Sequence, residues 1–208
     1  LPCRSVGLVD LRHIVKIMIN GKKISLVPAT LDDRRKVYEW CFHSVTTTSH
    51  TGLTDFPEKP IVTYAEFCDK HYEDYFFTGS RPIDGRGFLI THQAAPVGFI
   101  SYSSFHLRES LAEFDIWMNC ETNCGKGFGV DALVALGDFL NGTMDIHRLI
   151  IAPSNRNVRA IKSYEKAGFK KSDKAMSDFL LDEYVDIYGG GDYGIDGTAI
   201  LEKRFKVR

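Results

Sequence analysis

Three groups of residues in the middle of the chain have types and spacings suited to chemistry on a phosphate-bearing substrate. Glycines stand at positions 125, 127 and 129, and Lys126 lies among them. Glycine allows tight turns and a close backbone approach to a ligand. N–H groups of such a loop, followed by the free donors of a helix N-terminus, attract phosphate. Glu113 and Asp115 precede this loop, and Tyr164 follows it.

Two common nucleotide-binding motifs, the P-loop and the dinucleotide fingerprint, account for this loop only in part. A P-loop requires Ser or Thr after Gly-Lys, but Gly127 follows Lys126. The pattern Gly127-x-Gly129-x-x-Ala132 does satisfy the dinucleotide fingerprint. That fingerprint normally follows the first strand of its unit, whereas this loop lies behind several strand-like segments. A dinucleotide oxidoreductase is therefore kept as an alternative, which binding of NAD would support.

A third interpretation explains both the loop and the residues after it. The run from Cys124 to Gly129 resembles the acetyl-CoA diphosphate loop of the GNAT acetyltransferases, usually Arg/Gln-x-x-Gly-x-Gly/Ala, with Cys124 in the Arg/Gln position. The segment from Asn157 to Phe169 resembles the next motif of that family, about thirty residues on. The resemblance covers roughly residues 24–169. It is greatest to aminoglycoside 6′-N-acetyltransferases and weaker to polyamine and protein N-terminal acetyltransferases.

The resemblance implies roles for individual residues in acetyl transfer to an amine. Asp115 matches the catalytic base, and Glu113, on the same face of a strand, is the reserve candidate. Tyr164 matches the acid that faces the thioester sulfur. Both assignments have structural alternatives: the carboxylates would be a solvated strand edge, and Tyr164 a core residue with its hydroxyl satisfied by backbone. The choice between Asp115 and Glu113 stays open from sequence.

The predicted acetyl-CoA site joins a strand end, the glycine loop and a helix. Asn157 matches the residue that binds the pantetheine arm, and is also suited to cap a helix. The full set comprises Trp117, Met118, Asn119, Cys124, Gly125, Lys126, Gly127, Phe128, Gly129, Asn157, Ala160 and Tyr164. Acetyl-CoA is expected as co-substrate, without a metal.

The elements that must position these residues follow from periodicity and turn signals. Strands are predicted near 23–27, 88–91, 97–102, 112–119, 149–151, 179–187 and 198–205, and helices over 30–42, 63–76, 130–140 and 157–167. Capping boxes begin the first two helices, at Thr30 and Thr63. Polar residues 44–60 are interpreted as a loop near the acceptor site. The predicted class is α+β, which the resemblance specifies as a mixed, mostly antiparallel sheet with central splayed strands and flanking helices.

Length and composition favour one ordinary globular domain. The chain has 208 residues, 44% of them hydrophobic, and a net charge of −1. Residues 1–19 are interpreted as an N-terminal extension and residues 20–208 as a single GNAT domain. No basic run predicts nucleic-acid binding, and no apolar stretch is long enough for a membrane span. Five cysteines fit a reducing, cytoplasmic location, and Cys120 and Cys124 are interpreted as ordinary thiols.

The acceptor is expected to be a small cationic amine. Seven acidic residues against one lysine in the interval 173–196 would attract a polycation. The predicted function is an acetyl-CoA-dependent N-acetyltransferase acting by direct attack in a ternary complex, with an aminoglycoside antibiotic as one acceptor and antibiotic resistance as the consequence. Polyamine or protein N-terminal acetylation and a non-catalytic acyl-CoA sensor are the alternatives. A monomer and a homodimer are equally compatible with the sequence.

Overall fold

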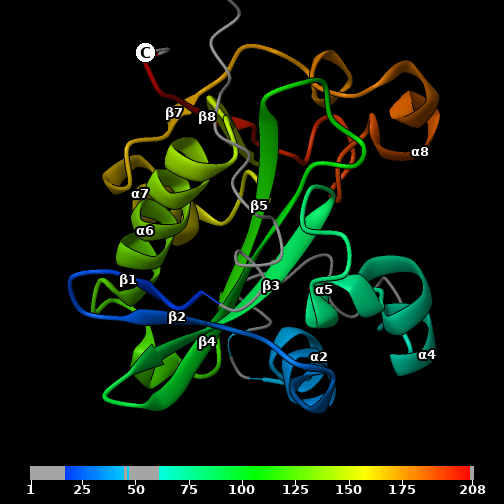
Figure 1. Ribbon diagram of the computed structural model, residues 1–208. Coiled ribbons are helices and arrows are strands. Elements are labelled where there is room, and N and C mark those ends of the chain that lie inside the picture. The colour runs from blue at the N-terminus through cyan, green and yellow to red at the C-terminus, as the bar shows by residue number, and fades with distance from the viewer. Residues whose placement is uncertain (1–16, 45, 47–60, 207–208) are drawn as a thin grey trace, which may run out of the picture.

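The computed structural model describes residues 17–44, 46 and 61–206, and these form one mixed sheet with helices on both faces (Figure 1). The sheet has the strand order β1-β2-β3-β4-β5-β6-β8-β7. The strands are β1 (Ile19–Asn20), β2 (Ser25–Pro28), β3 (Gly85–His92), β4 (Ala95–Ser103), β5 (Leu111–Met118), β6 (Arg148–Ile151), β7 (Lys170–Lys171) and β8 (Leu201–Arg204). Neighbours are antiparallel except β5 and β6, which are parallel. The predicted α+β class is confirmed.

The parallel pair at the centre of the sheet separates part-way along its length. Strand β5 pairs with β6 only from Leu111 to Glu113. On its other edge, β5 stays paired with β4 as far as Met118. Among the described residues, the second half of β5 therefore has a strand neighbour on one edge only, and the predicted splayed strands are confirmed.

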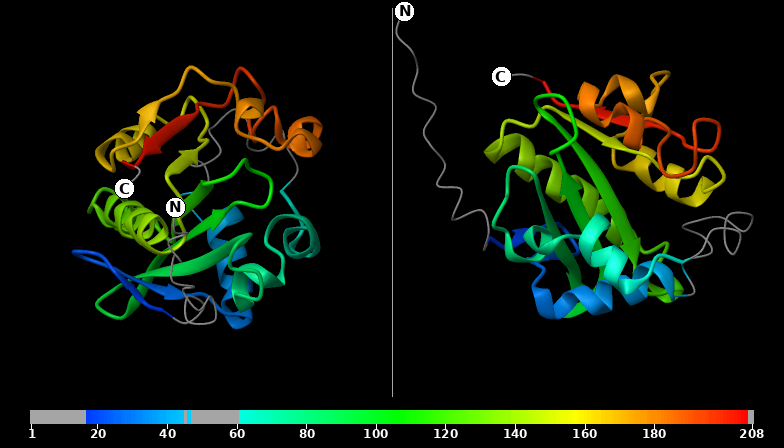
Figure 2. Two further views of the ribbon diagram at one scale, coloured as in Figure 1. Left: turned by 45° about the horizontal axis from the view of Figure 1, so that its top comes forward. Right: turned by 90° about the vertical axis from the view of Figure 1, so that its right-hand side faces the viewer.

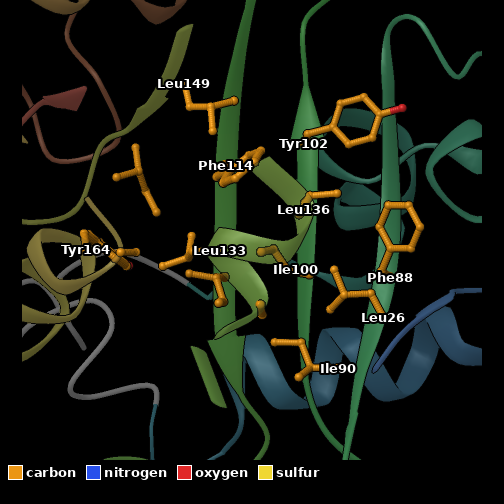
Figure 3. Close-up of a cluster of buried hydrophobic side chains, with 14 of the residues drawn as sticks. Leu26, Phe88, Ile90, Ile100, Tyr102, Phe114, Leu133, Leu136, Leu149 and Tyr164 are labelled. Carbon is orange, nitrogen blue, oxygen red and sulfur yellow. The ribbon is translucent and has the colours of Figure 1, made fainter. Parts of the chain in front are cut away.

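Helices cover both faces of the sheet. The longest, α6 (Phe128–Thr143), packs with α7 (Val158–Lys166) in the larger hydrophobic cluster. In Figure 3, Leu133 and Leu136 of α6 lie beside the strand residues Ile100 and Phe114. The other face is covered at one end by α2 (Arg34–Phe42), α4 (Tyr64–Glu66) and α5 (Asp74–Thr78). The C-terminal segment with α8 (Val185–Tyr188) covers its opposite end (Figure 2).

Alternation along β5 assigns its residues to these two faces. Ala112, Phe114 and Ile116 belong to the cluster under α6. Leu111 packs with the C-terminal segment and Trp117 with α2 and α5, so the odd-numbered residues face the other side. Glu113 and Asp115 thus lie between two separate apolar clusters. They share a face, as the sequence predicted.

The predicted helix 63–76 is interrupted. Its capping box is confirmed, because Thr63 N donates to Glu66 Oε2 at 3.0 Å and Glu66 N donates to Thr63 Oγ1 at 3.2 Å. A π-helical turn follows over Phe67–His71, and α5 begins only at Asp74. The break turns Tyr72, with φ −129° and ψ 70°, into the apolar cluster, where its exposure is 7%.

The strand predicted for residues 179–187 is wrong. Leu180 makes a single bridge to Leu107, after which the chain forms a 3-10 turn over Asp182–Tyr184 and then α8. Phe179 and Leu180 are both fully buried, so the apolar run fills space under the sheet instead of alternating across a strand. The strand predicted over 198–205 is present as the shorter β8.

The N-terminal boundary of the domain is only partly covered by the described residues. Residues 1–16 of the predicted extension lie outside them, as does most of the predicted loop 44–60. Ile19 already pairs with Leu26 in the sheet. The division between residues 19 and 20 stays a prediction. Among the described residues, no helix has the length and apolar character needed to cross a membrane.

Candidate active site

The glycine loop forms the turn that the sequence predicted, between the end of β5 and the start of α6. Gly125 and Gly127 have φ angles of +74° and +84°, the left-handed region that favours glycine. Cys124 N donates to Glu121 O at 2.9 Å, which closes a 3-10 turn before the loop. Gly127 is the N-cap of α6. The loop thus leads directly to the free donors of a sixteen-residue helix.

A cavity of about 190 Å³ opens beside this loop. Its walls come from the second half of β5, the start of α6 and one side of α7. Ten of the predicted acetyl-CoA residues line it, namely Trp117, Met118, Cys124, Gly125, Gly127, Phe128, Gly129, Asn157, Ala160 and Tyr164. Lys126 and Asn119 do not. The Asn119 side chain instead donates to Pro96 O at 3.0 Å and accepts from Asn123 Nδ2 at 2.9 Å.

Helix α7 carries two of the predicted residues on the side that faces the cavity. Asn157 Oδ1 accepts from Ala160 N at 3.1 Å, so Asn157 is the N-cap of this helix. Tyr164 follows about two turns later and is 7% exposed. The capping role of Asn157 is confirmed, and its contact with pantetheine stays a prediction.

A second cavity, of about 200 Å³, lies on the opposite face of the sheet. Three carboxylates line it, those of Glu113, Asp115 and Asp192. Aromatic side chains form much of the remaining wall, among them Tyr72, Phe105, His106 and Tyr188, and Lys70 and His71 complete it. This cavity combines negative charge with aromatic surface, which suits an organic cation.

Asp115 is held at the base of this cavity by a hydroxyl pair. Tyr72 Oη donates to Asp115 Oδ2 at 3.1 Å and lies 2.8 Å from Ser101 Oγ. The carboxyl reaches solvent through the cavity, but protein atoms surround it and limit its hydration. This desolvation, together with the charges of Asp192 and Glu113, raises the pKa of Asp115 to about 7. The hydrogen bond from Tyr72 acts in the opposite direction and lowers this pKa. A carboxylate with that pKa can accept a proton near neutral pH.

Glu113 has a different environment from Asp115. Its Oε2 lies 2.8 Å from His106 Nε2, and the His106 side chain is buried. His106 in turn packs at 5.4 Å, ring centroid to ring centroid, against Tyr188 of α8. Glu113 is therefore tied to the wall of the cavity, whereas Asp115 lies at its base.

A small cavity of about 30 Å³ lies at the gap between β5 and β6 and shares lining residues with both larger cavities. It is lined by both Asp115 and Tyr164, together with Asn157, Asp192 and Tyr193. Burial raises the pKa of Tyr164, and the negative charge of Asp115 raises that pKa further. Tyr164 is therefore protonated at neutral pH. The structure brings the predicted base and acid to one opening.

Several residues of this site escaped the sequence analysis. Tyr72 and His106 contact the carboxylates from separate segments, Ser101 contacts Tyr72, and no local motif marks these residues. Tyr193 follows a run of glycines that predicts only a turn. Of the seven acidic residues expected to attract the acceptor, only Asp192 lines a cavity with Asp115 among the described residues. Asp182, for example, pairs with Arg108 on the surface.

The sequence profile of the acetyltransferase (GNAT) domain family matches residues 23–170. The chain belongs to the GNAT acetyltransferases. The acetyltransferase activity predicted from the two motifs is confirmed at this level. No curated protein matches the chain.

Solved structures of GNAT enzymes share the fold. One is AAC(6')-Ib in complex with paromomycin and acetyl-CoA, with a TM-score of 0.62, 17% identity and coverage of 88% of this chain and 94% of the other. Another is RimL, a ribosomal L7/L12 alpha-N-protein acetyltransferase in complex with coenzyme A, with a TM-score of 0.63, 17% identity and coverage of 91% and 98%. A putative ribosomal-protein-serine acetyltransferase from Vibrio cholerae has a TM-score of 0.59, 17% identity and coverage of 92% and 99%. At these identities the likeness establishes the fold, not the acceptor.

The cysteines beside the loop show no metal-binding arrangement. Cys120 and Cys124 are free thiols, and burial raises the pKa of Cys124. Within the described part of the chain, no group of three or more His, Cys, Asp or Glu residues is arranged to hold a metal ion.

The raised pKa of Asp115 predicts a pH-dependent cost to stability. Because the pKa of about 7 exceeds the ordinary 3.8, the unfolded chain loses this proton first as the pH rises. The contribution of Asp115 to stability therefore falls between roughly pH 4 and 7. We expect Asp115→Asn to be more stable than the wild type at about pH 8, with a difference that vanishes near pH 4. Urea unfolding across this range measures it, and a constant difference would contradict it.

Proposed function

We propose that this protein is an acetyl-CoA-dependent N-acetyltransferase that acetylates a primary amine of a small polycation, with aminoglycosides as the leading acceptor class. The observation that carries the proposal is the small opening lined by both Asp115 and Tyr164, between one cavity at the glycine loop and another rich in carboxylates. Acetyl-CoA supplies an activated acetyl group as a thioester. The chain's own residues hold it, orient the amine and move two protons.

The loop side of the site fits the donor. Positive φ angles at Gly125 and Gly127 leave the loop backbone uncovered by side chains, next to the positive end of α6. The second half of β5 forms no ladder with β6 among the described residues, and Ile116, Trp117 and Met118 line the cavity, so we propose that the amide groups of pantetheine pair along this strand edge. Asn157, Ala160 and Tyr164 line the same cavity.

Asp115 is proposed as the base. A primary amine with a pKa near 10.4 is almost fully protonated at neutral pH, so a proton must leave it before or during attack. Asp115 accepts this proton on the acceptor side, while the amine nitrogen forms its bond to the thioester carbonyl carbon. Glu113, held by His106, is proposed to attract the cation without taking the proton.

Tyr164 is proposed as the acid. When the carbon–sulfur bond breaks, the departing thiolate needs one proton to become the free thiol of CoA. Tyr164 lines both the loop cavity and the opening, and its protonated hydroxyl is proposed to supply this proton. Its burial beside Asp115 makes the phenolate unfavourable, so a proton returns to Tyr164 through solvent or from Asp115 after release.

The charge of the acceptor cavity favours a polycation over the other acceptor classes. Glu113, Asp115 and Asp192 line it, against Lys70 and His71. A peptide N-terminus brings one cationic group, whereas aminoglycosides and polyamines bring several. The cytoplasmic location, the role in antibiotic resistance and the oligomeric state stay predictions.

The acceptor class is tested by thiol release from acetyl-CoA with kanamycin, spermidine and a short peptide as acceptors. We expect the highest kcat/KM with the aminoglycoside, turnover with the polyamine, and the least with the peptide. Turnover confined to the peptide would contradict the proposal. CoA binding without turnover on any acceptor would favour an acyl-CoA sensor.

Asp115→Asn should remove the pH dependence that belongs to the base. For the wild type we expect kcat/KM to rise with pH through an inflection near 7, where Asp115 loses its proton. In the variant this inflection should disappear and the rate should fall by about 10²–10⁴-fold. Glu113→Gln is the matched control and should retain the inflection. Loss of the inflection in the Glu113 variant alone would reverse the two roles.

Tyr164→Phe keeps the ring and removes only the hydroxyl. We expect kcat to fall by about 10²-fold, because protonation of the departing thiolate is lost, with little change in CoA affinity. Glu165→Gln, a change of an exposed residue beside Tyr164 on α7 that does not line the cavity, is the control. Stopped-flow thiol detection with the preferred acceptor measures the rate. An unchanged kcat would exclude Tyr164 as the acid.

A further inference from the structure

The turn between β1 and β2 is fixed to the start of α6 by one carboxylate. Asp131, in the first turn of α6, accepts three backbone N–H bonds from this turn, with distances of 3.0 Å from Lys22, 2.6 Å from Lys23 and 3.2 Å from Ile24. A Cβ on Gly21 would lie 2.6 Å from Asp131 Oδ2, so glycine is needed for this close approach. The two segments are more than 100 residues apart in sequence.

This attachment places the ammonium group of Lys23 on the glycine loop. Lys23 Nζ donates to Lys126 O at 3.2 Å and would lie 3.5 Å from a Cβ on Gly127. The backbone of Lys23 is also fixed on its other side, because its carbonyl oxygen lies 2.8 Å from His92 Nδ1. The His92 ring packs against that of Phe128 at 4.5 Å between centroids. The backbone of Lys23 is thus held by Asp131 of α6 and by His92 of β3.

Lys23 brings a positive charge to this point of the site. Asp131 brings a negative charge to the helix end that would otherwise attract a diphosphate. Its bonds to three N–H groups offset part of that charge. From Cys124 to Gly129 the loop contains one charged side chain, Lys126. Neither Lys126 nor Lys23 lines the cavity, whose basic residues are Arg159 and Lys166 of α7. Lys23 approaches the loop beside Gly127, at the start of α6. The ammonium of Lys23 has three donors and gives one to Lys126 O, so two remain for an incoming oxygen.

We propose that Lys23 is a diphosphate-binding residue of the acetyl-CoA site, and that Asp131 is the residue that positions it. This inference rests on the proposed function, since it assigns the loop cavity to acetyl-CoA. It adds a contact from outside the glycine loop, supplied by a turn near the beginning of the fold. A purely structural lysine, bonded only to the Lys126 carbonyl, would affect stability and not discriminate between ligands.

Isothermal titration calorimetry with three ligands separates these roles. CoA carries the diphosphate and a 3′-phosphate, dephospho-CoA keeps only the diphosphate, and pantetheine lacks both. We expect Lys23→Met to weaken CoA and dephospho-CoA alike, by on the order of 10-fold, because a charge-assisted hydrogen bond is lost. Pantetheine binding should not change. Lys22→Met, a change of the neighbouring lysine in the same turn, should leave all three affinities unchanged.

Three results would overturn the assignment of Lys23. These are an unchanged CoA affinity in Lys23→Met, an equal loss for pantetheine, and a loss for CoA that is absent for dephospho-CoA. The last would assign the lysine to the 3′-phosphate instead. If wild-type protein binds none of the three ligands, the proposed function itself fails. If wild-type protein binds CoA and the Lys23→Met variant binds it equally well, only the assignment of Lys23 fails.

Discussion

The site depends on the separation of β5 from β6. Beyond Glu113, β5 forms no ladder with β6 among the described residues, and this part of β5 lines the cavity beside the glycine loop. Unpaired backbone in a protein interior is costly unless something else pairs with it. A ligand with amide groups along its length can do so. At this gap, one small cavity is lined both by Asp115, on one face of the sheet, and by Tyr164 of α7, which packs on the other face.

The chemistry near this opening conflicts with stability. Asp115 reaches solvent through its cavity but lies between two apolar clusters, close to Asp192 and Glu113, and these surroundings raise its pKa. A carboxylate in ordinary solvent would be a weaker base, so the environment that costs stability also makes Asp115 effective near neutral pH. Tyr72, turned inward by the break before α5, holds the carboxylate by a single hydrogen bond. The fold tolerates one poorly solvated charge and restrains its position.

The sequence predicted the parts of this account that are encoded locally. The glycine loop and the segment from Asn157 to Phe169 carry their signals within a few residues, and both form the expected structures. Contacts between distant segments carried no such signal, as for Tyr72 with Asp115 and for Lys23 with Lys126. The segment 179–187 was mistaken for a strand because apolar residues that fill a cluster resemble a buried strand in sequence. The sequence left open which of Glu113 and Asp115 is the base, because alternation along the strand does not identify His106 as the partner of Glu113.

A crystal structure of the protein with bound CoA tests the central claim most directly. The account predicts the pantetheine arm in the gap between β5 and β6, with its sulfur about 3–3.5 Å from Tyr164 Oη and its diphosphate on the N–H groups of residues 125–129. A diphosphate bound elsewhere, a sulfur remote from Tyr164, or side chains that still fill the gap with CoA bound outside it would contradict the account.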